Sequence, residues 1–246
     1  IFKSLNVFFE NKYNKYSLNK LNFLKKSIIL NFLVLLFVFC VFVTVAPSID
    51  LYVAGLFFRA DQEYGYSFLL QSYNFFSILF SDIFLPIILL YILILPILSK
   101  YINLKKIFFN HVFTIRDIFI IWFSQILIVL VFVNGILKNY WGRARPEDVI
   151  QLGGLESFTP WYILSEACNK NCSFVSGDAS VGFSFIILYL ITRNVAYVYL
   201  AIVFGSLIGL IRILAGGHFL SDIVFAGVFI IILNYLIIKF FSKVWP

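Results

Sequence analysis

The segment IFIIWFSQILIVLVFVNGIL, residues 118–137, decides the fold class of this chain. None of its residues is charged, and a helix of about 20 apolar residues is what the hydrocarbon core of a bilayer requires. A helix is suited to that environment because it satisfies its backbone hydrogen bonds internally. The segment therefore predicts a transmembrane helix in an integral membrane protein.

The composition of the whole chain agrees with a membrane protein. Of 246 residues, 62% are hydrophobic and 13% are charged, whereas soluble domains have about 45–50% apolar and about 25% charged residues. Disordered, collagen-like and coiled-coil classes are excluded, and three cysteines are too few for a small disulfide scaffold. The net charge of +7 lies at the ends of apolar runs, which is typical of membrane topology signals. We therefore expect no nucleic-acid partner.

Five further apolar runs complete the expected fold, an all-α polytopic membrane protein with six transmembrane helices. They are Ile28–Ala46, Ile78–Leu98, Phe174–Thr192, Val195–Leu214 and Phe219–Phe241. Residues 1–26 form a basic N-terminal segment, and residues 27–246 form the six-helix domain. The first run imitates a secretory signal peptide, but it is long enough to span, so an uncleaved helix is favoured.

The distribution of Lys and Arg predicts the orientation of these helices. With a cytoplasmic N-terminus, 13 of the 19 cations fall on the cytoplasmic side and six on the other. The positive-inside rule then puts both termini in the cytoplasm. The ends of the third and fifth helices and the starts of the fourth and sixth meet at the extracytoplasmic face. The loop from Ser48 to Asn74 is interpreted as an interfacial segment beside them.

One of the two histidines in the chain is a candidate nucleophile at that face. His218 and Asp222 are four residues apart, so they share a face where the sixth helix begins. A carboxylate can fix one imidazole nitrogen as the proton donor, which leaves the lone pair of the other nitrogen free to attack. The alternative is a buried pair that only stabilises the start of the helix.

Phosphate-binding groups are expected at the same face. Ser176 and Gly177 open the fourth helix, where unpaired backbone N–H groups favour an anion. Lys138, Arg145 and Arg212 converge from other helix ends and would neutralise a phosphate, Arg in bidentate fashion. Taken singly, Ser176 is an ordinary helix cap and each cation a charge at the membrane interface.

The ordered motifs Lys138-x6-Arg145-Pro146, Ser176-Gly177 and Arg212-x5-His218-x3-Asp222 resemble the type 2 phosphatidic acid phosphatase superfamily. The resemblance covers about residues 27–241 and implies a hydrolase of lipid phosphomonoesters or pyrophosphates that needs neither metal nor cofactor. It implies that His218 forms a phosphohistidine, that Asp222 orients it, and that the groups named above bind phosphate.

One position departs from the family pattern. The second family motif ends Ser-Gly-His, and its histidine protonates the leaving alkoxide, whereas this chain has Asp178. One hypothesis is that Asp178 takes over as the general acid, with activity shifted toward lower pH. The other is that Asp178 only caps the helix or pairs with an arginine, so that turnover is slow or the substrate is a pyrophosphate.

The remaining expectations concern the loop before the second motif, the substrate and the location. Cys168 and Cys172 form a possible disulfide on the oxidising side of the membrane. Candidate substrates are undecaprenyl pyrophosphate, phosphatidylglycerophosphate, phosphatidate and lipid A phosphate. The expected location is the bacterial inner membrane, with the site facing the periplasm or exterior. A lipid-to-lipid phosphotransferase and a catalytically weak headgroup-binding relative are the alternatives.

Overall fold

A computed structural model describes residues 47–61, 65–70, 79–101 and 111–245, together with Phe37 and Val41. The chain divides into two units, Ile1–Phe42 and Val43–Pro246, and the elements below belong to the second. The basic segment 1–26 lies outside the described residues. The predicted helix Ile28–Ala46 also lies outside them, apart from Phe37 and Val41, which are helical.

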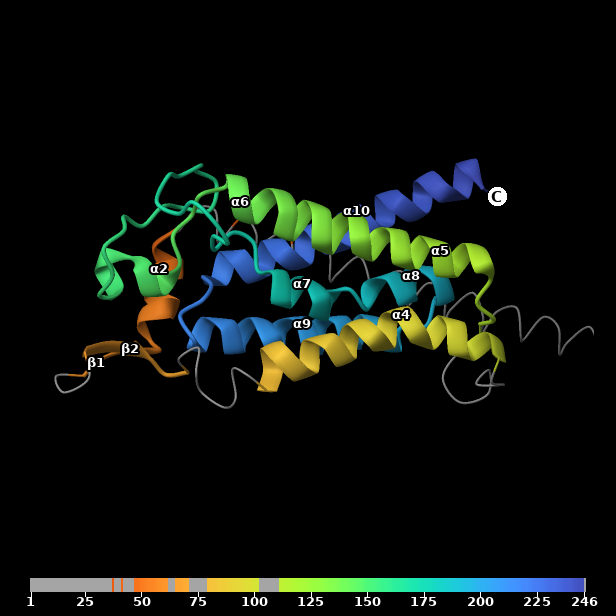
Figure 1. Cartoon of the computed structure of the whole chain (residues 1–246), viewed down its shortest axis with the longest axis horizontal. Coiled ribbons are helices and arrows are strands. Elements are labelled where there is room, and N and C mark those ends of the chain that lie inside the picture. The colour runs from red at the N-terminus through yellow and green to blue at the C-terminus, as the bar shows by residue number, and fades with distance from the viewer. Residues whose placement is uncertain are drawn as a thin grey trace, which may run out of the picture. The chain divides into compact units, whose positions relative to one another are not determined.

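The second unit is mostly helical (Figure 1). Its elements among the described residues are α2 (Ser48–Gly55), β1 (Phe58–Asp61), β2 (Gly65–Phe68), η1 (Leu79–Phe84), α4 (Leu85–Tyr101), α5 (Ile115–Ser124), η3 (Gln125–Leu137), α6 (Lys138–Tyr140), η4 (Pro146–Asp148), η5 (Ile150–Leu152), α7 (Gly177–Phe183), α8 (Ile186–Thr192), α9 (Ala196–Leu214) and α10 (Leu220–Val244). The two strands form an antiparallel hairpin in which Phe58 pairs with Phe68.

Three of the predicted helices are confirmed as long apolar helices that could cross a membrane. They are Ile115–Tyr140, which joins α5, η3 and α6, Ala196–Leu214 and Leu220–Val244. Leu85–Ser99 and Gly177–Thr192 are apolar but shorter. The described part of the chain is therefore built around three candidate membrane spans with shorter apolar helices beside them.

The predicted helix Phe174–Thr192 differs from the structure, because it begins at Gly177 and is divided into α7 and α8. Ser180 Oγ donates to the carbonyl of Ser176, and Ser184 Oγ donates to the carbonyl of Ser180, both at 2.8 Å. Such bonds from serine to the preceding turn compete with the backbone and bend helices. The amides of Ser184 and Ile187 then bond three residues back, a tighter pattern than the α-helix has.

The helices pack around a core of Ile, Leu, Val and Phe side chains. α7 packs closely against α9 at two glycines, Gly182 and Gly205. A Cβ atom at Gly182 would lie 2.7 Å from the backbone nitrogen of Gly205, and one at Gly205 would lie 2.3 Å from the ring of Phe183. Only residues without side chains allow this contact, which brings the start of α7 beside the end of α9.

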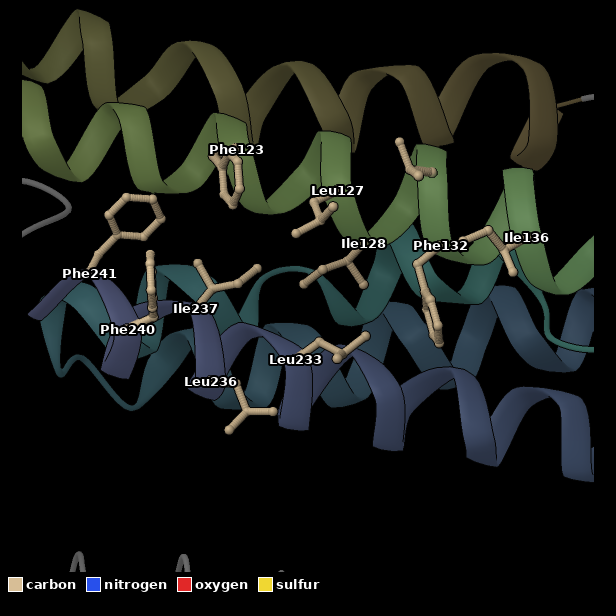
Figure 2. A pocket seen from close by; sticks show the side chains of 11 residues that line it. Phe123, Leu127, Ile128, Phe132, Ile136, Leu233, Leu236, Ile237, Phe240 and Phe241 are labelled. Atoms are coloured by element: carbon tan, nitrogen blue, oxygen red, sulfur yellow. The ribbon is translucent and has the colours of Figure 1, made fainter. Parts of the chain in front are cut away.

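The membrane-facing surface is apolar as well. A groove of about 480 Å³ runs between the α5–η3 helix and α10, and Figure 2 shows side chains of both helices lining it. Its lining is Phe123, Leu127, Ile128, Val131, Phe132, Ile136, Leu233, Leu236, Ile237, Phe240 and Phe241. An apolar outer surface on long helices is what lipid chains require of their surroundings.

The two ends of the helical bundle are chemically different. At one end lie α2, the β1–β2 hairpin, α6 and the long loop between α6 and α7 (Figure 1). The C-terminal end of α10 and the N-terminal end of α5 lie at the opposite end. The polar residues singled out in the sequence gather at the first end, where the chain enters and leaves the helices.

Candidate active site

His218 lies in the short connection between α9 and α10 and is fully buried. Its Nδ1 lies 3.7 Å from Oδ2 of Asp222 in the first turn of α10. Among the residues that the structure describes, neither ring nitrogen has a hydrogen-bond partner within normal distance. The carboxylate thus faces Nδ1, which leaves Nε2 available to another group.

Asp222 is itself held in place by three donors. Nη1 of Arg143 donates to its Oδ1 at 2.6 Å. Ser173 Oγ and the backbone amide of Phe219 donate to its Oδ2, at 2.5 and 2.8 Å. The bond from Phe219 also caps the N-terminus of α10, so the start of that helix and the orientation of the carboxylate depend on each other.

The surroundings of His218 favour its neutral form. Burial lowers the pKa of His218 from 6.5 to about 4. The positive charges of Lys138 and Arg212 act in the same direction, whereas Asp222 opposes them. A neutral imidazole has the free lone pair that a nucleophile needs.

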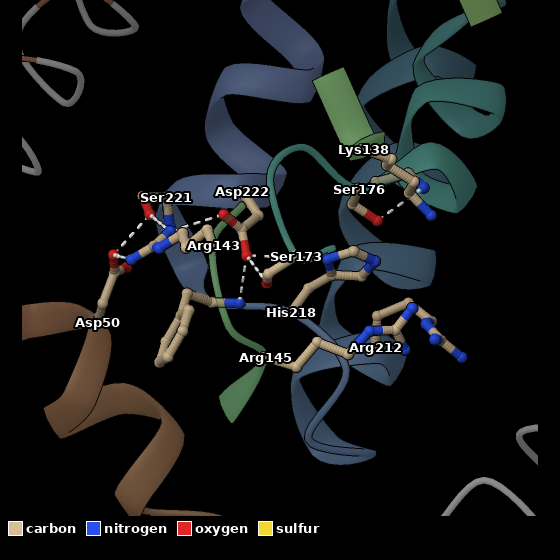
Figure 3. A network of polar contacts seen from close by, with 12 residues as sticks. Asp50, Lys138, Arg143, Arg145, Ser173, Ser176, Arg212, His218, Ser221 and Asp222 are labelled. Atoms are coloured by element: carbon tan, nitrogen blue, oxygen red, sulfur yellow. Dashed lines mark hydrogen bonds and ion pairs between the residues drawn. The ribbon is translucent and has the colours of Figure 1, made fainter. Parts of the chain in front are cut away.

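The three predicted phosphate-binding cations lie on the side of the imidazole away from Asp222 (Figure 3). Lys138 and Arg145 are both braced by Asn171, which has a left-handed backbone φ of 55°. Nζ of Lys138 lies 3.4 Å from Oδ1 of Asn171, and Nη2 of Arg145 donates to its carbonyl at 2.9 Å. The cations are therefore positioned before any substrate arrives.

Arg212, in the last turn of α9, pairs with Asp178 in the first turn of α7. Its Nε lies 3.1 Å from Oδ2 of Asp178, and both side chains are partly exposed. Pairing with an arginine is what the second hypothesis about Asp178 expects. It also places a carboxyl group within the cluster of cations, as the first hypothesis requires.

Ser176 and Gly177 form the start of α7. Ser176 is the N-cap residue, and its Oγ accepts from the amide of Ala179 at 3.3 Å. The Ser176 amide donates to the backbone carbonyl of Asp222 at 3.3 Å, which joins α7 to α10. A Cβ at Gly177 would lie 2.5 Å from Oδ1 of Asn134, so this position accepts only glycine while the Asn134 side chain keeps its place.

Four residues of the site were not recognised from the sequence: Asp50, Arg143, Ser173 and Ser221. Arg143 is fully buried and contacts both Asp50 and Asp222. From the sequence, Arg143 is only one of the six cations assigned to the extracytoplasmic side. The available signal was its place in Gly-Arg-Ala-Arg, two residues before Arg145 in the first motif.

The long loop before α7 contains a disulfide between Cys168 and Cys172. Asn171 lies within this small ring. The amide of Cys172 donates to the carbonyl of Lys138, and that of Ser173 donates to the carbonyl of Arg143, both at 2.9 Å. The disulfide therefore lies in the segment that positions two of the cations. Within the described ranges, no group of three or more His, Cys, Asp or Glu side chains is placed to hold a metal ion.

Comparison with known proteins bears directly on this arrangement. Residues 119–246 match the model of the PAP2 superfamily. The chain belongs to the PAP2 superfamily. The matched region contains all three motifs and every site residue named above except Asp50. This PAP2 protein is therefore a membrane-embedded phosphatase of lipid phosphoesters.

Curated relatives of this PAP2 protein include a lipid A 4'-phosphatase of Francisella tularensis subsp. novicida (strain U112). It is 36% identical over 216 residues, which are 83% of this chain and 91% of the relative. A lipid A 4'-phosphatase of Rhizobium leguminosarum is 38% identical over 95 residues, 37% of this chain and 41% of that protein. No solved structure matches the chain.

Proposed function

We propose that this protein removes a phosphate monoester from a lipid A-type glycolipid at the extracytoplasmic face of the membrane, through a phosphohistidine formed on His218. One observation carries the proposal: a buried, neutral imidazole lies between a fixed carboxylate and three cations. The carboxylate can orient the imidazole as a nucleophile, and the cations can bind a phosphate. This arrangement supports phosphoryl transfer better than binding alone.

In the first step, Nε2 of His218 donates its lone pair to phosphorus. The bond between phosphorus and the lipid oxygen breaks, and that oxygen takes a proton from a nearby acid. Asp222 stabilises the positive charge that develops on the imidazole, because its Oδ2 faces Nδ1. Lys138, Arg145 and Arg212 stabilise the charge on the phosphoryl oxygens. Ser176 and the amide of Gly177 assist in holding the phosphate.

In the second step, water attacks the phosphohistidine. The phosphorus–nitrogen bond breaks, inorganic phosphate leaves, and the proton of the water returns to the acid that supplied the first one. We assign this acid–base role to Asp178. Its place beside Arg212 supports the assignment, because the same arginine binds the phosphate whose leaving oxygen needs the proton.

The substrate assignment draws on the relatives. The Francisella relative, named a lipid A 4'-phosphatase, is similar over 83% of this chain. Lipid A phosphate was one of four substrates expected from the sequence, and this similarity makes it the first to test. Undecaprenyl pyrophosphate, phosphatidylglycerophosphate and phosphatidate are the comparison substrates.

The topology proposed for this activity has six membrane helices and both termini in the cytoplasm of a bacterial inner membrane. Arg116 and Lys243 support it, because they belong to the end of the bundle opposite the site. The site then faces the periplasm, where the disulfide is stable. To test this orientation, a cysteine is introduced either at Glu156 or at Lys243. The labelling of the two variants by a reagent that does not cross the membrane is then compared.

The activity test uses the purified full-length protein in detergent. Phosphate release is measured from the four lipids across about pH 4–8, a range that includes the ordinary pKa of histidine. We expect release from lipid A phosphate, lost in His218→Ala and kept in the surface variant Glu156→Gln. Equal release by wild type and His218→Ala would contradict the proposal.

Product analysis separates this function from its two alternatives. A phosphotransferase would move the phosphoryl group to a second lipid, so lipid A would lose phosphate without an equal amount of inorganic phosphate appearing. A catalytically weak headgroup-binding relative would bind lipid A phosphate without turnover. The lipid A phosphatase predicts one inorganic phosphate for each dephosphorylated lipid.

A further inference from the structure

Arg143 is a fully buried arginine whose guanidinium group is shared by two carboxylates from distant parts of the chain. Its Nη2 donates to Oδ2 of Asp50 at 2.8 Å, and its Nη1 donates to Oδ1 of Asp222 at 2.6 Å. The ring of Phe219 covers the guanidinium, with its centroid 4.4 Å from Cζ. Nε donates to the carbonyl of Thr159 at 2.9 Å. These hydrogen bonds hold the guanidinium group in one defined orientation.

Asp50 belongs to α2, outside the region that matches the family model. Its side chain is 1% exposed, and its carboxylate accepts hydrogen bonds from Arg143 and Ser221. The amide of Ser221 donates to Oδ1 at 2.8 Å, and the Ser221 hydroxyl donates to Oδ2 at 2.5 Å, beside Arg143. Although burial raises the pKa of Asp50, Arg143 opposes that shift. These donors favour the carboxylate form in the folded protein.

The network therefore leads from α2 to the nucleophile (Figure 3). Arg143 and Ser221 link Asp50 to Asp222, and Asp222 faces Nδ1 of His218. Arg143 donates to Oδ1 of Asp222, while Ser173 and the Phe219 amide donate to Oδ2, and together they hold Oδ2 toward the imidazole. Rotation of the carboxylate would break the bonds from both Arg143 and Ser173.

The net charge of the network is suited to a nucleophilic imidazole. Two carboxylates and one guanidinium leave one net negative charge next to a neutral imidazole. Attack on phosphorus makes that imidazole positive, so the buried cluster becomes neutral as the reaction proceeds. Without the charge of Asp50, Arg143 would neutralise Asp222 before the reaction begins, and the developing positive charge would lose its partner.

We propose that Asp50 and Arg143 are positioning residues for phosphoryl transfer: together they orient Asp222 toward His218 and preserve its negative charge. This inference rests on the proposed function of His218 as the nucleophile. It extends the reaction centre to α2, which carries none of the family motifs. Neither residue is among the groups proposed to bind the phosphate, so both act on the chemical step through Asp222.

The test compares kcat and KM for the variants Asp50→Asn, Ser221→Ala and Glu156→Gln, with lipid A phosphate as substrate. Asp50→Asn keeps the shape of the side chain and removes its charge. We expect kcat to fall about 10- to 100-fold, the size of effect that a misplaced catalytic group produces, while KM changes less than about twofold. Glu156→Gln removes an exposed charge and is expected to match wild type.

Ser221→Ala is the second variant, because it removes a bridging hydroxyl without adding volume or charge. We expect a fall in kcat of about 3- to 10-fold, again with KM unchanged. Thermal unfolding of each purified variant shows whether it is folded. If Asp50→Asn does not fold, Ser221→Ala decides the matter: wild-type kcat in that variant would overturn the inference.

Wild type and His218→Ala in the same assay distinguish a failure of the proposed function from a failure of the positioning role. If wild type releases no phosphate, or if His218→Ala releases as much as wild type, the proposed function fails and this inference fails with it. If both behave as expected but Asp50→Asn and Ser221→Ala keep the wild-type kcat, only the positioning role is wrong. A parallel rise in KM would also contradict it.

Discussion

Asp178 in α7 and Arg212 in α9 form an ion pair, with Oδ2 of the aspartate 3.1 Å from Nε of the arginine. The pair joins the start of one helix to the end of another, directly beside the predicted phosphate site. A phosphate that binds Arg212 therefore meets Asp178 as a competitor for the same guanidinium. In the proposed reaction, Asp178 is also the neighbouring group that gives a proton to the leaving oxygen.

Substitution of Asp178 separates these roles. Asp178→Asn keeps the size of the side chain but cannot donate an acidic proton, so we expect kcat for lipid A phosphate to fall about 100-fold. The loss should be smaller for undecaprenyl pyrophosphate, whose leaving group needs less protonation. Asp178→His restores a titratable donor and should recover activity at neutral pH. Steady-state kinetics with both substrates measure these effects.

The opposite result would assign Asp178 to ion pairing alone. In that case Asp178→Asn would keep its kcat for the monoester, and KM would fall because Arg212 is released for phosphate. Leu155→Asn provides a control that introduces the same side chain at an exposed position of the same face.

The protonation of His218 leads to a prediction about pH. Burial lowers its pKa from 6.5 to about 4, so the neutral nucleophile should persist down to about pH 4. Selective ¹⁵N labelling of histidine measures this directly, because the chain has only two histidines and His111→Gln assigns the signals. We expect the His218 signal to titrate well below the 6.5 of a free imidazole. A midpoint near 6.5 would contradict the buried, neutral form.

The same shift predicts how stability changes with acid. The folded pKa of His218 lies below the unfolded value, so the unfolded chain binds more protons between about pH 6.5 and 4. The contribution of His218 to stability is complete above this window and decreases as pH falls through it. The loss of thermal stability between those pH values should be smaller in His218→Phe than in wild type.

The residues of the site differ in how far the sequence could predict them. His218, Arg145 and Arg212 are polar groups at the ends of apolar runs, where a functional role is the default expectation. Asp50 could not be paired with Arg143 in this way, because 93 positions separate them and no local spacing brings them together. Their contact depends on the tertiary fold.

Helix boundaries that depend on tertiary or side-chain contacts were also not predictable from the sequence. The apolar pattern predicted Val195–Leu214 within one residue of the observed α9. It did not predict the break between α7 and α8, because the serines that cause it are compatible with an unbroken helix until their side chains bond to the preceding turn. The hairpin β1–β2 was likewise not expected within the segment interpreted as interfacial.

The contact between α7 and α9 predicts a strong effect of a single methyl group. Gly205→Ala would place a Cβ 2.3 Å from the ring of Phe183, so the ring must shift and the packing of α7 on α9 must adjust. Overpacking of this kind costs about 1–3 kcal/mol, and we expect a lower midpoint of thermal unfolding in detergent. Gly55→Ala is the matched control, since a Cβ there meets nothing within 4 Å. Equal midpoints for the two variants would show that α7 and α9 tolerate separation.

The disulfide between Cys168 and Cys172 predicts a redox effect on substrate binding. It closes the ring that holds Asn171, and Asn171 in turn braces Lys138 and Arg145. In Cys168→Ser/Cys172→Ser the loop gains freedom, so the two cations must be ordered when phosphate binds. We expect KM to rise about 3- to 10-fold, which corresponds to about 1 kcal/mol, while kcat changes little because other contacts hold Asp222.

Reduction of the wild-type protein should produce the same rise in KM, and reductant should have no further effect on the double variant. Lys170→Ala is the control, because it alters the charge of the same loop and leaves the disulfide in place. If KM is unchanged after reduction while free thiol titration confirms that the bond is broken, Asn171 is held by its own backbone contacts. A fall in kcat without a change in KM would instead connect the loop to the chemical step through Ser173, which donates to Asp222.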